Sequence, residues 1–345
     1  MYTIQEDYSF AGGVPSAPYS IDKSVIDKLD PVYVEFYKTA LSNNPNILYT
    51  HRVPLKEIRE SGNVIPGQTP LVEMEKTFDI KINDIIPARV FVPKGEPPKA
   101  GFPCFIWFHG GGHVLGNINT ENSFCTHVAD MSKTIVISVD YRLAPEHPFP
   151  AAPEDAYASL LWVYESGSGI GIDINKITIG GSSAGGNLAA VVCQKFVNDP
   201  KTTKLPPIKL QVLIVPVTDC TTTPKTTESW KEFEFTPQLP AEKMLWYRAL
   251  YLPNESDLTN PEASPLFYSD ESFSKNPPCL VAVAECDVLK TEGIEYGKKL
   301  EKNGVKTEIN VYKGVPHPVM VMDAVIDQGR QLLKDVTNAI KQSVV

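Results

Sequence analysis

The sequence predicts an α/β protein that is built on a mostly parallel sheet. From about residue 70 onward, short apolar segments typical of strands alternate with segments in which apolar residues recur at helical spacing. Several of the apolar segments are uninterrupted, as is typical of parallel strands that are covered on both faces. Hydrophobic residues make up 42% of the 345 residues, which is enough to fill a sizeable core.

The expected elements follow one another in a regular order. Strands are expected at 71–80, 88–93, 104–108, 134–139, 177–179, 210–217, 280–284 and 307–312. Helices are expected at 153–164, 184–197, 291–303 and 318–340. The third helix ends at Asn303 and Gly304, a pair that is typical of a helix C-terminus.

Two segments fall outside this alternation. Residues 1–50 include apolar positions at helical spacing between 29 and 40. Residues 219–260 are rich in threonine and proline and contain three bulky aromatic residues, Trp230, Trp246 and Tyr247, with a weak helical pattern at 241–250. We expect the two segments to form a cap over a main domain at 51–345. For 219–260 the alternative is a loop that only packs on the core.

Charge and cysteine content exclude some classes of partner. The net charge is −9, so we expect neither nucleic acid nor an anionic membrane surface as a partner, because both repel an acidic protein. No segment reaches the ~18 consecutive apolar residues of a membrane helix, and the first residues lack the basic and apolar regions of a signal peptide. The six cysteines form no CxxC pair, which predicts reduced thiols and a cytoplasmic protein.

A serine motif follows the strand expected at 177–179. Residues 181–185 read Gly-Ser-Ser-Ala-Gly, a G-x-S-x-G pattern, and a helical segment follows. A sharp strand-to-helix turn of this kind exposes the oxygen of Ser183, and small flanking residues let the turn close. The helix N-terminus also directs free N–H groups at the site. The alternatives are a glycine-rich turn without chemistry, or one that binds phosphate; Ser182 is the competing serine.

A second glycine motif lies upstream, where His109 precedes three consecutive glycines after an apolar strand. Acyl transfer needs backbone N–H donors where the tetrahedral oxygen develops charge. An HGGG element upstream of G-x-S-x-G is typical of lipases and esterases. We therefore assign the N–H groups of Gly111, Gly112 and Ala184 to an oxyanion hole. We expect His109 to shape the glycine turn by hydrogen bonding.

A base and an acid complete the predicted site, because a serine hydroxyl is weakly nucleophilic until a base takes its proton. In the α/β-hydrolase fold, which these motifs indicate, the nucleophile, the acid and the histidine follow one another in that chain order. His317 is the only histidine after Ser183, and it lies in a loop after a strand. Asp287, just past the strand at 280–284, is the expected acid. Glu285 is the next candidate; Glu292 and Asp270 fit less well.

With these residues in place, the chain resembles the hormone-sensitive-lipase-like family of carboxylesterases. The resemblance runs from about residue 85 to the C-terminus and rests on 109–112, on 140–155 and on the serine motif with Gly186. It implies an eight-stranded sheet flanked by helices, with a helical cap built from the N-terminal helices and the insertion after the sixth strand. It also implies the triad Ser183, Asp287 and His317, and a homodimer formed through the C-terminal strand and helix.

The chain departs from the family pattern at three places near the site. Ser182 stands where the family often has aspartate, His113 where it usually has an aromatic residue, and 318–319 where it usually has Gly-Phe. His113 and Trp246 are therefore our candidates for the substrate pocket. In the run 140–155, Arg142 and Glu146 are expected to form an ion pair that braces the oxyanion-hole region.

The predicted function is a serine carboxylesterase that acts on small esters of short to medium acyl length. No HExxH or clustered His/Cys pattern occurs, so we expect neither a metal nor a cofactor. The main alternative is a ligand-binding receptor on the same scaffold. A lactonase, a deacetylase or an arylformamidase would use the same triad, and fold and triad do not choose among them.

Overall fold

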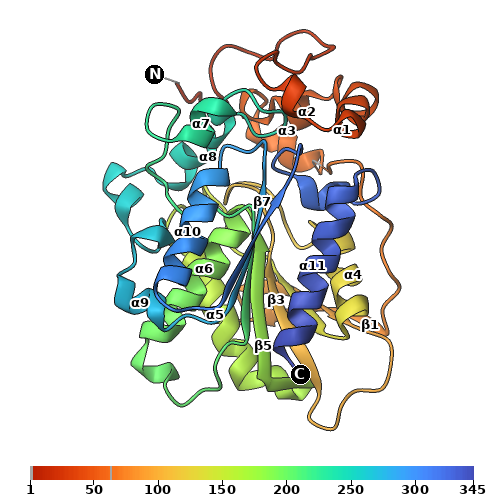
Figure 1. Cartoon of the computed structure of the whole chain (residues 1–345), viewed down its shortest axis with the longest axis vertical. Coiled ribbons are helices and arrows are strands. Elements are labelled where there is room, and N and C mark those ends of the chain that lie inside the picture. Colours follow the sequence, from red (N-terminus) through yellow and green to blue (C-terminus); the bar gives the residue numbers. More distant parts are fainter. Residues whose placement is uncertain (1–2, 63) are drawn as a thin grey trace.

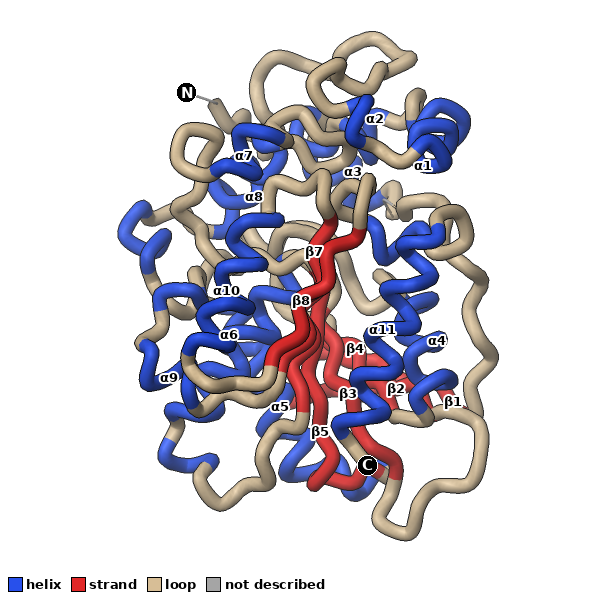
Figure 2. Tube along the Cα trace, in the orientation of Figure 1, coloured by secondary structure: helices blue, strands red, loops and turns tan. Residues whose placement is uncertain are grey.

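The structure is a computed structural model that describes residues 3–62 and 64–345. A central eight-stranded sheet has helices on both faces (Figures 1 and 2). Its strands are β1 (Lys76–Ile82), β2 (Ile86–Val92), β3 (Phe102–Phe108), β4 (Ile135–Val139), β5 (Ile172–Ser182), β6 (Leu210–Ile214), β7 (Cys279–Ala284) and β8 (Thr307–Tyr312). Their order across the sheet is β1-β2-β4-β3-β5-β6-β7-β8. The predicted α/β-hydrolase sheet is thereby confirmed.

Six neighbouring strands, from β4 to β8 in the sheet order, run parallel, whereas β1 and β2 form an antiparallel hairpin at one edge. Every residue of β3, β4, β6 and β7 is buried, as their uninterrupted apolar sequences predicted. The first strand begins at Lys76 rather than at 71, because its partner β2 ends at Val92, which pairs with Lys76. The fifth strand is longer than predicted, since pairing with β3 begins at Ile172.

Helices cover both faces of the sheet. The longer ones are α4 (Asn122–Ser132), α5 (Ala151–Ser166), α6 (Ala184–Asn198), α10 (Lys290–Lys302) and α11 (Asp327–Ser343), and α9 (Asp270–Ser274) is short. Helices α5, α6 and α10 lie on one face, and α4 and α11 pack together on the other (Figure 1). No helix within residues 3–62 and 64–345 is long and apolar enough to cross a membrane.

One helix was missed and one helix prediction was wrong in part. Helix α4 was not predicted. The helix expected at 318–340 begins only at Asp327, because Val319–Met322 forms a separate, buried 3-10 helix. The chain turns after that helix, where the N–H of Ala324 donates to the carbonyl of Gly67 over 2.9 Å. The carboxylate of Asp323 also accepts hydrogen bonds from Thr69. These contacts with residues 67–69 keep Asp323 and Ala324 out of a continuous helix. The helix is therefore interrupted between Met322 and Asp327.

The N-terminal segment, residues 3–62, and the insertion after β6 meet at one end of the sheet (Figure 1). The first contains α1 (Pro31–Phe36), a π-helical turn at Tyr37–Leu41, α2 (Pro45–Leu48) and α3 (Leu55–Glu60), and the insertion contains α7 (Glu228–Glu232) and α8 (Ala241–Tyr251). The indole N–H of Trp246 donates to the carbonyl of Tyr8 over 2.6 Å. The ammonium of Lys243 donates to the carbonyl of Ile47 over 3.0 Å. Residues far apart in the sequence therefore hold the two segments together.

Candidate active site

Ser183 occupies the sharp turn between β5 and α6. Its backbone has φ 55° and ψ −114°, a conformation that a non-glycine residue rarely adopts. The turn is fixed by the N–H of Ser183, which donates to the carbonyl of Ile214 over 2.8 Å. A Cβ at Gly185 would lie 1.9 Å from the carbonyl oxygen of Phe108, so only glycine fits there. The hydroxyl of the competing serine, Ser182, donates instead to the carboxylate of Glu121 over 2.7 Å.

The structure brings His317 and Asp287 together, as the sequence predicted for the base and the acid. His317 follows β8, Asp287 follows β7, and Nδ1 of the imidazole lies 2.7 Å from Oδ2 of the carboxylate. The Asp287 side chain is fully buried, and the N–H of Leu289 donates to its Oδ1 over 3.1 Å. Parallel strands end at the same edge of a sheet, so these residues and Ser183 share that edge.

The other acids considered from the sequence have different partners. Glu285 accepts from Lys313 and from the N–H of Gly314. Asp270 is paired with Lys302 at the surface. Glu292 is fully buried, and it accepts from Thr218 and Thr222 and from the indole of Trp230. Burial raises the pKa of Glu292 to about 7, while the hydrogen bonds lower it. The bond to His317 therefore distinguishes Asp287 from the alternatives.

The glycine turn at 110–112 follows β3. Gly111 and Gly112 have φ of +120° and +64°, values that favour glycine. A Cβ at Gly111 would lie 2.2 Å from the carbonyl oxygen of Leu115, and one at Gly112 would lie 2.2 Å from the ring of Tyr247. Within residues 3–62 and 64–345, the N–H groups of Gly111 and Gly112 have no acceptor. Ala184 begins α6, where an N–H has no acceptor within the helix.

Two histidines flank the glycines and are held by stacked tyrosines. The ring of His109 stacks on Tyr141 at 4.4 Å, and its Nδ1 lies 2.7 Å from the carbonyl of Gly110, which confirms the expected hydrogen bond. The hydroxyl of Tyr141 donates to the carbonyl of His109 over 2.7 Å. The ring of His113 stacks on Tyr251 of α8 at 3.8 Å. Burial lowers the pKa of His109 to about 4 and that of His113 to about 3, so both rings are neutral at pH 7.

The two residues proposed for the substrate pocket, His113 and Trp246, are both buried: His113 packs on Tyr251 of α8, and Trp246 belongs to α8 itself. Trp246 is fully buried and donates to Tyr8, and its ring packs on Tyr247 at 4.9 Å. The residue of the insertion that contacts the glycine turn is Tyr247, whose ring lies against Gly112. The sequence showed Tyr247 only as a bulky aromatic residue of the insertion.

Sequence analysis missed Glu121, which precedes α4 in a left-handed conformation with φ 62°. Its buried carboxylate accepts from three groups: the hydroxyl of Ser182 at 2.7 Å, the indole of Trp107 at 2.9 Å and the N–H of Gly110 at 3.2 Å. No local pattern signals this role, because the partners lie on separate elements. Burial raises the pKa of Glu121 to about 7, against the opposing effect of these hydrogen bonds.

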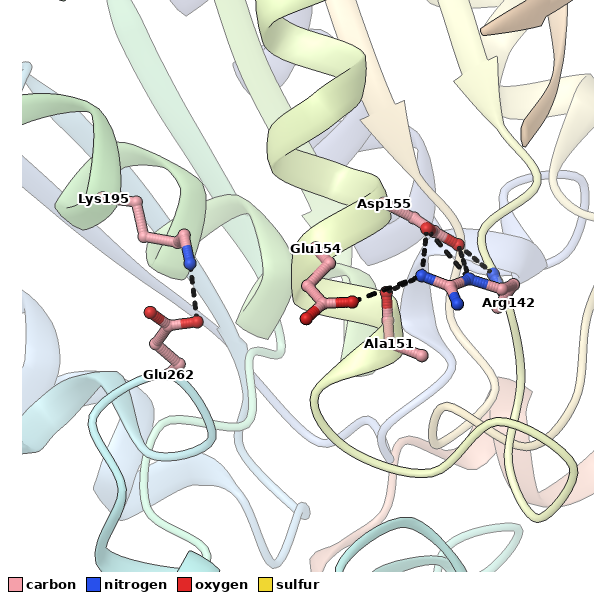
Figure 3. A network of polar contacts seen from close by, with 6 residues as sticks. All are labelled: Arg142, Ala151, Glu154, Asp155, Lys195 and Glu262. Atoms are coloured by element: carbon pink, nitrogen blue, oxygen red, sulfur yellow. Dashed lines mark hydrogen bonds and ion pairs between the residues drawn. The ribbon is translucent and has the colours of Figure 1, made fainter. Parts of the chain in front are cut away.

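The expected ion pair between Arg142 and Glu146 does not form. The guanidinium of Arg142 instead binds Asp155 of α5, with Nη2 2.7 Å from Oδ1, and reaches Glu154 and the carbonyl of Ala151 (Figure 3). Glu146 pairs with Arg59 of α3 at 2.7 Å. Arg59 also donates to the carbonyls of Val114 and Ala144. The region after the glycine turn is thus braced by Arg59 from the N-terminal segment, which is a long-range contact.

Comparison with known proteins decides the family. The sequence profile of the α/β-hydrolase fold matches residues 105–321, which is more than half of the chain. The chain belongs to the α/β-hydrolase fold family. Among relatives within this family, an AB hydrolase superfamily protein of Schizosaccharomyces pombe is 54% identical over 327 residues, covering 93% of this chain and 95% of the relative. The ethyl acetate hydrolase of Pseudomonas putida is 30% identical and covers 83% and 88%.

Solved structures of the α/β-hydrolase fold are similar to this chain in both fold and sequence. An esterase of Pyrobaculum calidifontis has a TM-score of 0.78 and 32% identity, covering 92% of this chain and 100% of that chain. Carboxyl esterase 2 of the fungus Tuber melanosporum has a TM-score of 0.78 and 27% identity, with the same coverage. The resemblance to the hormone-sensitive-lipase-like carboxylesterases is thereby confirmed.

Proposed function

We propose that this protein is a serine carboxylesterase that hydrolyses small esters of short to medium acyl length through an acyl-enzyme on Ser183. The observation that carries the proposal is the contact between Nδ1 of His317 and Oδ2 of Asp287 at 2.7 Å. Because Nδ1 faces the carboxylate, Nε2 is the ring nitrogen left to accept a proton. The esterases and ester hydrolases among the relatives support the same chemistry.

The acylation step begins when the oxygen of Ser183 attacks the ester carbonyl and Nε2 of His317 takes the hydroxyl proton. The carbonyl oxygen becomes an oxyanion that accepts hydrogen bonds from the N–H groups of Gly111, Gly112 and Ala184. Asp287 holds the imidazole in the required tautomer and stabilises the imidazolium. When the tetrahedral intermediate collapses, the bond to the alcohol oxygen breaks, and His317 gives that oxygen its proton.

The deacylation step repeats this sequence with water. Nε2 of His317 takes a proton from the water as its oxygen attacks the acyl carbon. The bond to Ser183 then breaks, and the serine oxygen recovers the proton from His317. The carboxylic acid leaves, and every group returns to its starting state.

We further propose that residues 1–50 and 219–260 act together as a cap over this site. The contact of Tyr247 with Gly112 supports this proposal, because it brings the insertion to the proposed oxyanion hole. The ring of Tyr247 beside Gly112 limits the length of the acyl or alcohol group that fits next to the proposed oxyanion hole. This is our reason for proposing small esters rather than long-chain lipids.

The test is hydrolysis of p-nitrophenyl esters of increasing acyl length by the parent, by Ser183→Ala and by a matched control, Ser168→Ala, whose serine is exposed in the 3-10 helix (Gly167–Ile170) that follows α5. We expect a burst of nitrophenol and turnover on short acyl chains in the parent and the control, and neither in Ser183→Ala. Equal rates in the parent and Ser183→Ala would contradict the proposal.

The same assay separates the alternatives. Turnover of lactones, acetylated amines or aryl formamides in place of esters would assign the triad to one of those substrates. Saturable binding of an ester without release of alcohol would indicate a ligand-binding receptor. The bond between His317 and Asp287 weighs against the receptor, since binding alone does not need an oriented imidazole.

Two further proposals concern the state of the protein in the cell. We propose a homodimer formed through β8, an edge strand of the sheet, together with α11. We also propose a cytoplasmic location, because all six cysteines are buried free thiols. A monomeric mass in size-exclusion chromatography with light scattering would contradict the first, and recovery of the protein outside the cytoplasm by cell fractionation the second.

A further inference from the structure

The geometry around Glu121 points to a positioning residue for the proposed reaction: we propose that its carboxylate aligns the glycine turn with Ser183. This inference rests on the proposed esterase chemistry. Asp287 contacts the imidazole directly, whereas Glu121 acts through Gly110 and Ser182, the neighbours of the proposed reacting groups.

The carboxylate of Glu121 accepts hydrogen bonds from three separate elements. The donors are Trp107 at the end of β3, Gly110 in the glycine turn and Ser182 at the end of β5. Gly110 is adjacent to Gly111, and Ser182 is adjacent to Ser183. A single side chain thus fixes the distance between the oxyanion donors and the nucleophile. Losing such alignment weakens a donor without removing it.

Gly110 packs closely against both Ser182 and Glu121. A Cβ added at Gly110 would lie 2.7 Å from the hydroxyl oxygen of Ser182 and 3.2 Å from Oε1 of Glu121. The glycine turn, the serine turn and the carboxylate are therefore in direct contact, with no room for another side chain between them. The left-handed backbone of Glu121 directs its side chain into this place from the start of α4.

All three partners of Glu121 are donors, and an ionised carboxylate, which only accepts, satisfies all of them. An amide in its place has one acceptor oxygen and an N–H group that faces these donors. A change of the carboxylate to an amide should therefore loosen the alignment of the two turns.

The family pattern often has an aspartate at position 182, where this chain has Ser182. The Ser182 hydroxyl lies 2.7 Å from the Glu121 carboxylate, so a carboxylate at 182 would lie in the same polar space. This offers a rescue experiment. Glu121→Gln removes the charge at nearly constant size, and Ser182→Asp returns a carboxylate that can accept from the amide of the glutamine.

The experiment compares the parent, Glu121→Gln, the double variant with Ser182→Asp, and the control Glu165→Gln, which changes an exposed glutamate of α5. For Glu121→Gln on p-nitrophenyl butyrate we expect kcat to fall by about 10–100-fold, since alignment is weakened rather than lost, with KM nearly unchanged. The double variant should recover much of the lost kcat.

Two further measurements keep the proposal falsifiable. Ser182→Ala removes one contact of the carboxylate, so it should also lower kcat with KM nearly unchanged. The rate at which a fluorophosphonate labels Ser183 reports the alignment even where no tested ester is a substrate, so a wrong substrate and a wrong role for Glu121 are distinguishable. The role is overturned if folded Glu121→Gln matches the parent in kcat and labelling rate, or if its losses persist in the folded double variant. If Glu121→Gln does not fold, a Ser182→Ala variant that matches the parent in kcat overturns the role.

Discussion

The ring of Tyr247 lies directly against the α-carbon of Gly112, where a Cβ would come within 2.2 Å of the aromatic carbons. Helix α8 of the insertion and the glycine turn of the sheet are thus in contact at the proposed oxyanion hole. The contact leaves no space for a side chain at 112, and it connects the most specific motif of the sequence with its least regular segment.

Gly112→Ala tests this contact. We expect kcat/KM to fall by about 100-fold or more, because the methyl group displaces either the ring or the N–H donor. Adding Tyr247→Ala should restore part of the activity, since the backbone φ of +64° is then the remaining penalty. Gly169→Ala is the control, because Gly169 is exposed and its Cβ would meet no atom within 4 Å. Unchanged ester hydrolysis by Gly112→Ala would contradict the assignment of Gly112.

Asp287→Asn tests the acid of the triad. We expect kcat to fall by about 10,000-fold at neutral pH, because an amide holds the imidazole of His317 in the wrong tautomer. Glu285→Gln is the matched control, since Glu285 was the other candidate and binds Lys313 instead. Steady-state kinetics on one ester measures both. A larger loss in Glu285→Gln than in Asp287→Asn would reverse the assignment.

Trp246→Phe tests how the N-terminal segment is held. The variant keeps the aromatic packing on Tyr247 and loses the N–H that donates to Tyr8. The loss of one partly buried hydrogen bond costs about 1 kcal/mol, so amide exchange in residues 3–14 should speed up about fivefold. Hydrogen exchange with mass spectrometry measures this, with Trp162→Phe as the control. Equal protection of residues 3–14 in both variants would mean that other contacts hold the segment.

Lys243→Met tests the buried lysine that lies between the N-terminal segment and the insertion. Burial lowers the pKa of Lys243 from 10.5 to about 7, and its partners are the carbonyls of Ile47 and Gln238. Between those pH values the unfolded chain holds one proton more than the folded chain. The contribution of Lys243 to the free energy of unfolding therefore rises with pH, by about 1.4 kcal/mol for each pH unit.

Urea unfolding at pH 7.5 and pH 9 measures this effect as the difference between the parent and Lys243→Met, which should grow with pH. Taking the difference cancels the titration of the buried tyrosines and cysteines. Lys56→Met, at an exposed lysine, should show no such growth. A parent-minus-variant difference that stays constant would mean that Lys243 is charged in the folded protein.

Local sequence patterns predicted the strands and the turn that carries Ser183. Uninterrupted apolar segments identify strands buried on both faces, and G-x-S-x-G describes a turn that closes only with glycine at 185. Chain order then selected His317 and Asp287, and the structure brings them into contact. The strands and the serine turn were predicted from residues close together in the sequence, whereas His317 and Asp287 were predicted from the chain order of the fold.

The features that were missed depend on contacts between distant residues. Helix α4 has no clear apolar stripe, because several of its buried positions are polar: the hydroxyls of Ser123, Thr126 and Ser132 are satisfied by carbonyl groups. Glu121 accepts a hydrogen bond from Ser182, which lies 61 positions away in the sequence. Arg142 and Glu146 are close in sequence, but each has a better-placed partner elsewhere. Spacing alone does not predict such choices.

The mutual hold of the N-terminal segment and the insertion has a consequence for engineering. Two of the bonds between them end on main-chain carbonyls, those of Tyr8 and Ile47, and Nη2 of Arg52 donates to both carboxylate oxygens of Glu242. A chimera that takes one segment from a homologue can lose the donor side chains that its other segment needs. A chimera that takes both segments from the same homologue keeps the bonds between them and must match only their contacts with the main domain. We therefore expect the two segments to be exchangeable between homologues as a pair, and libraries that vary one segment alone to lose folded variants more often.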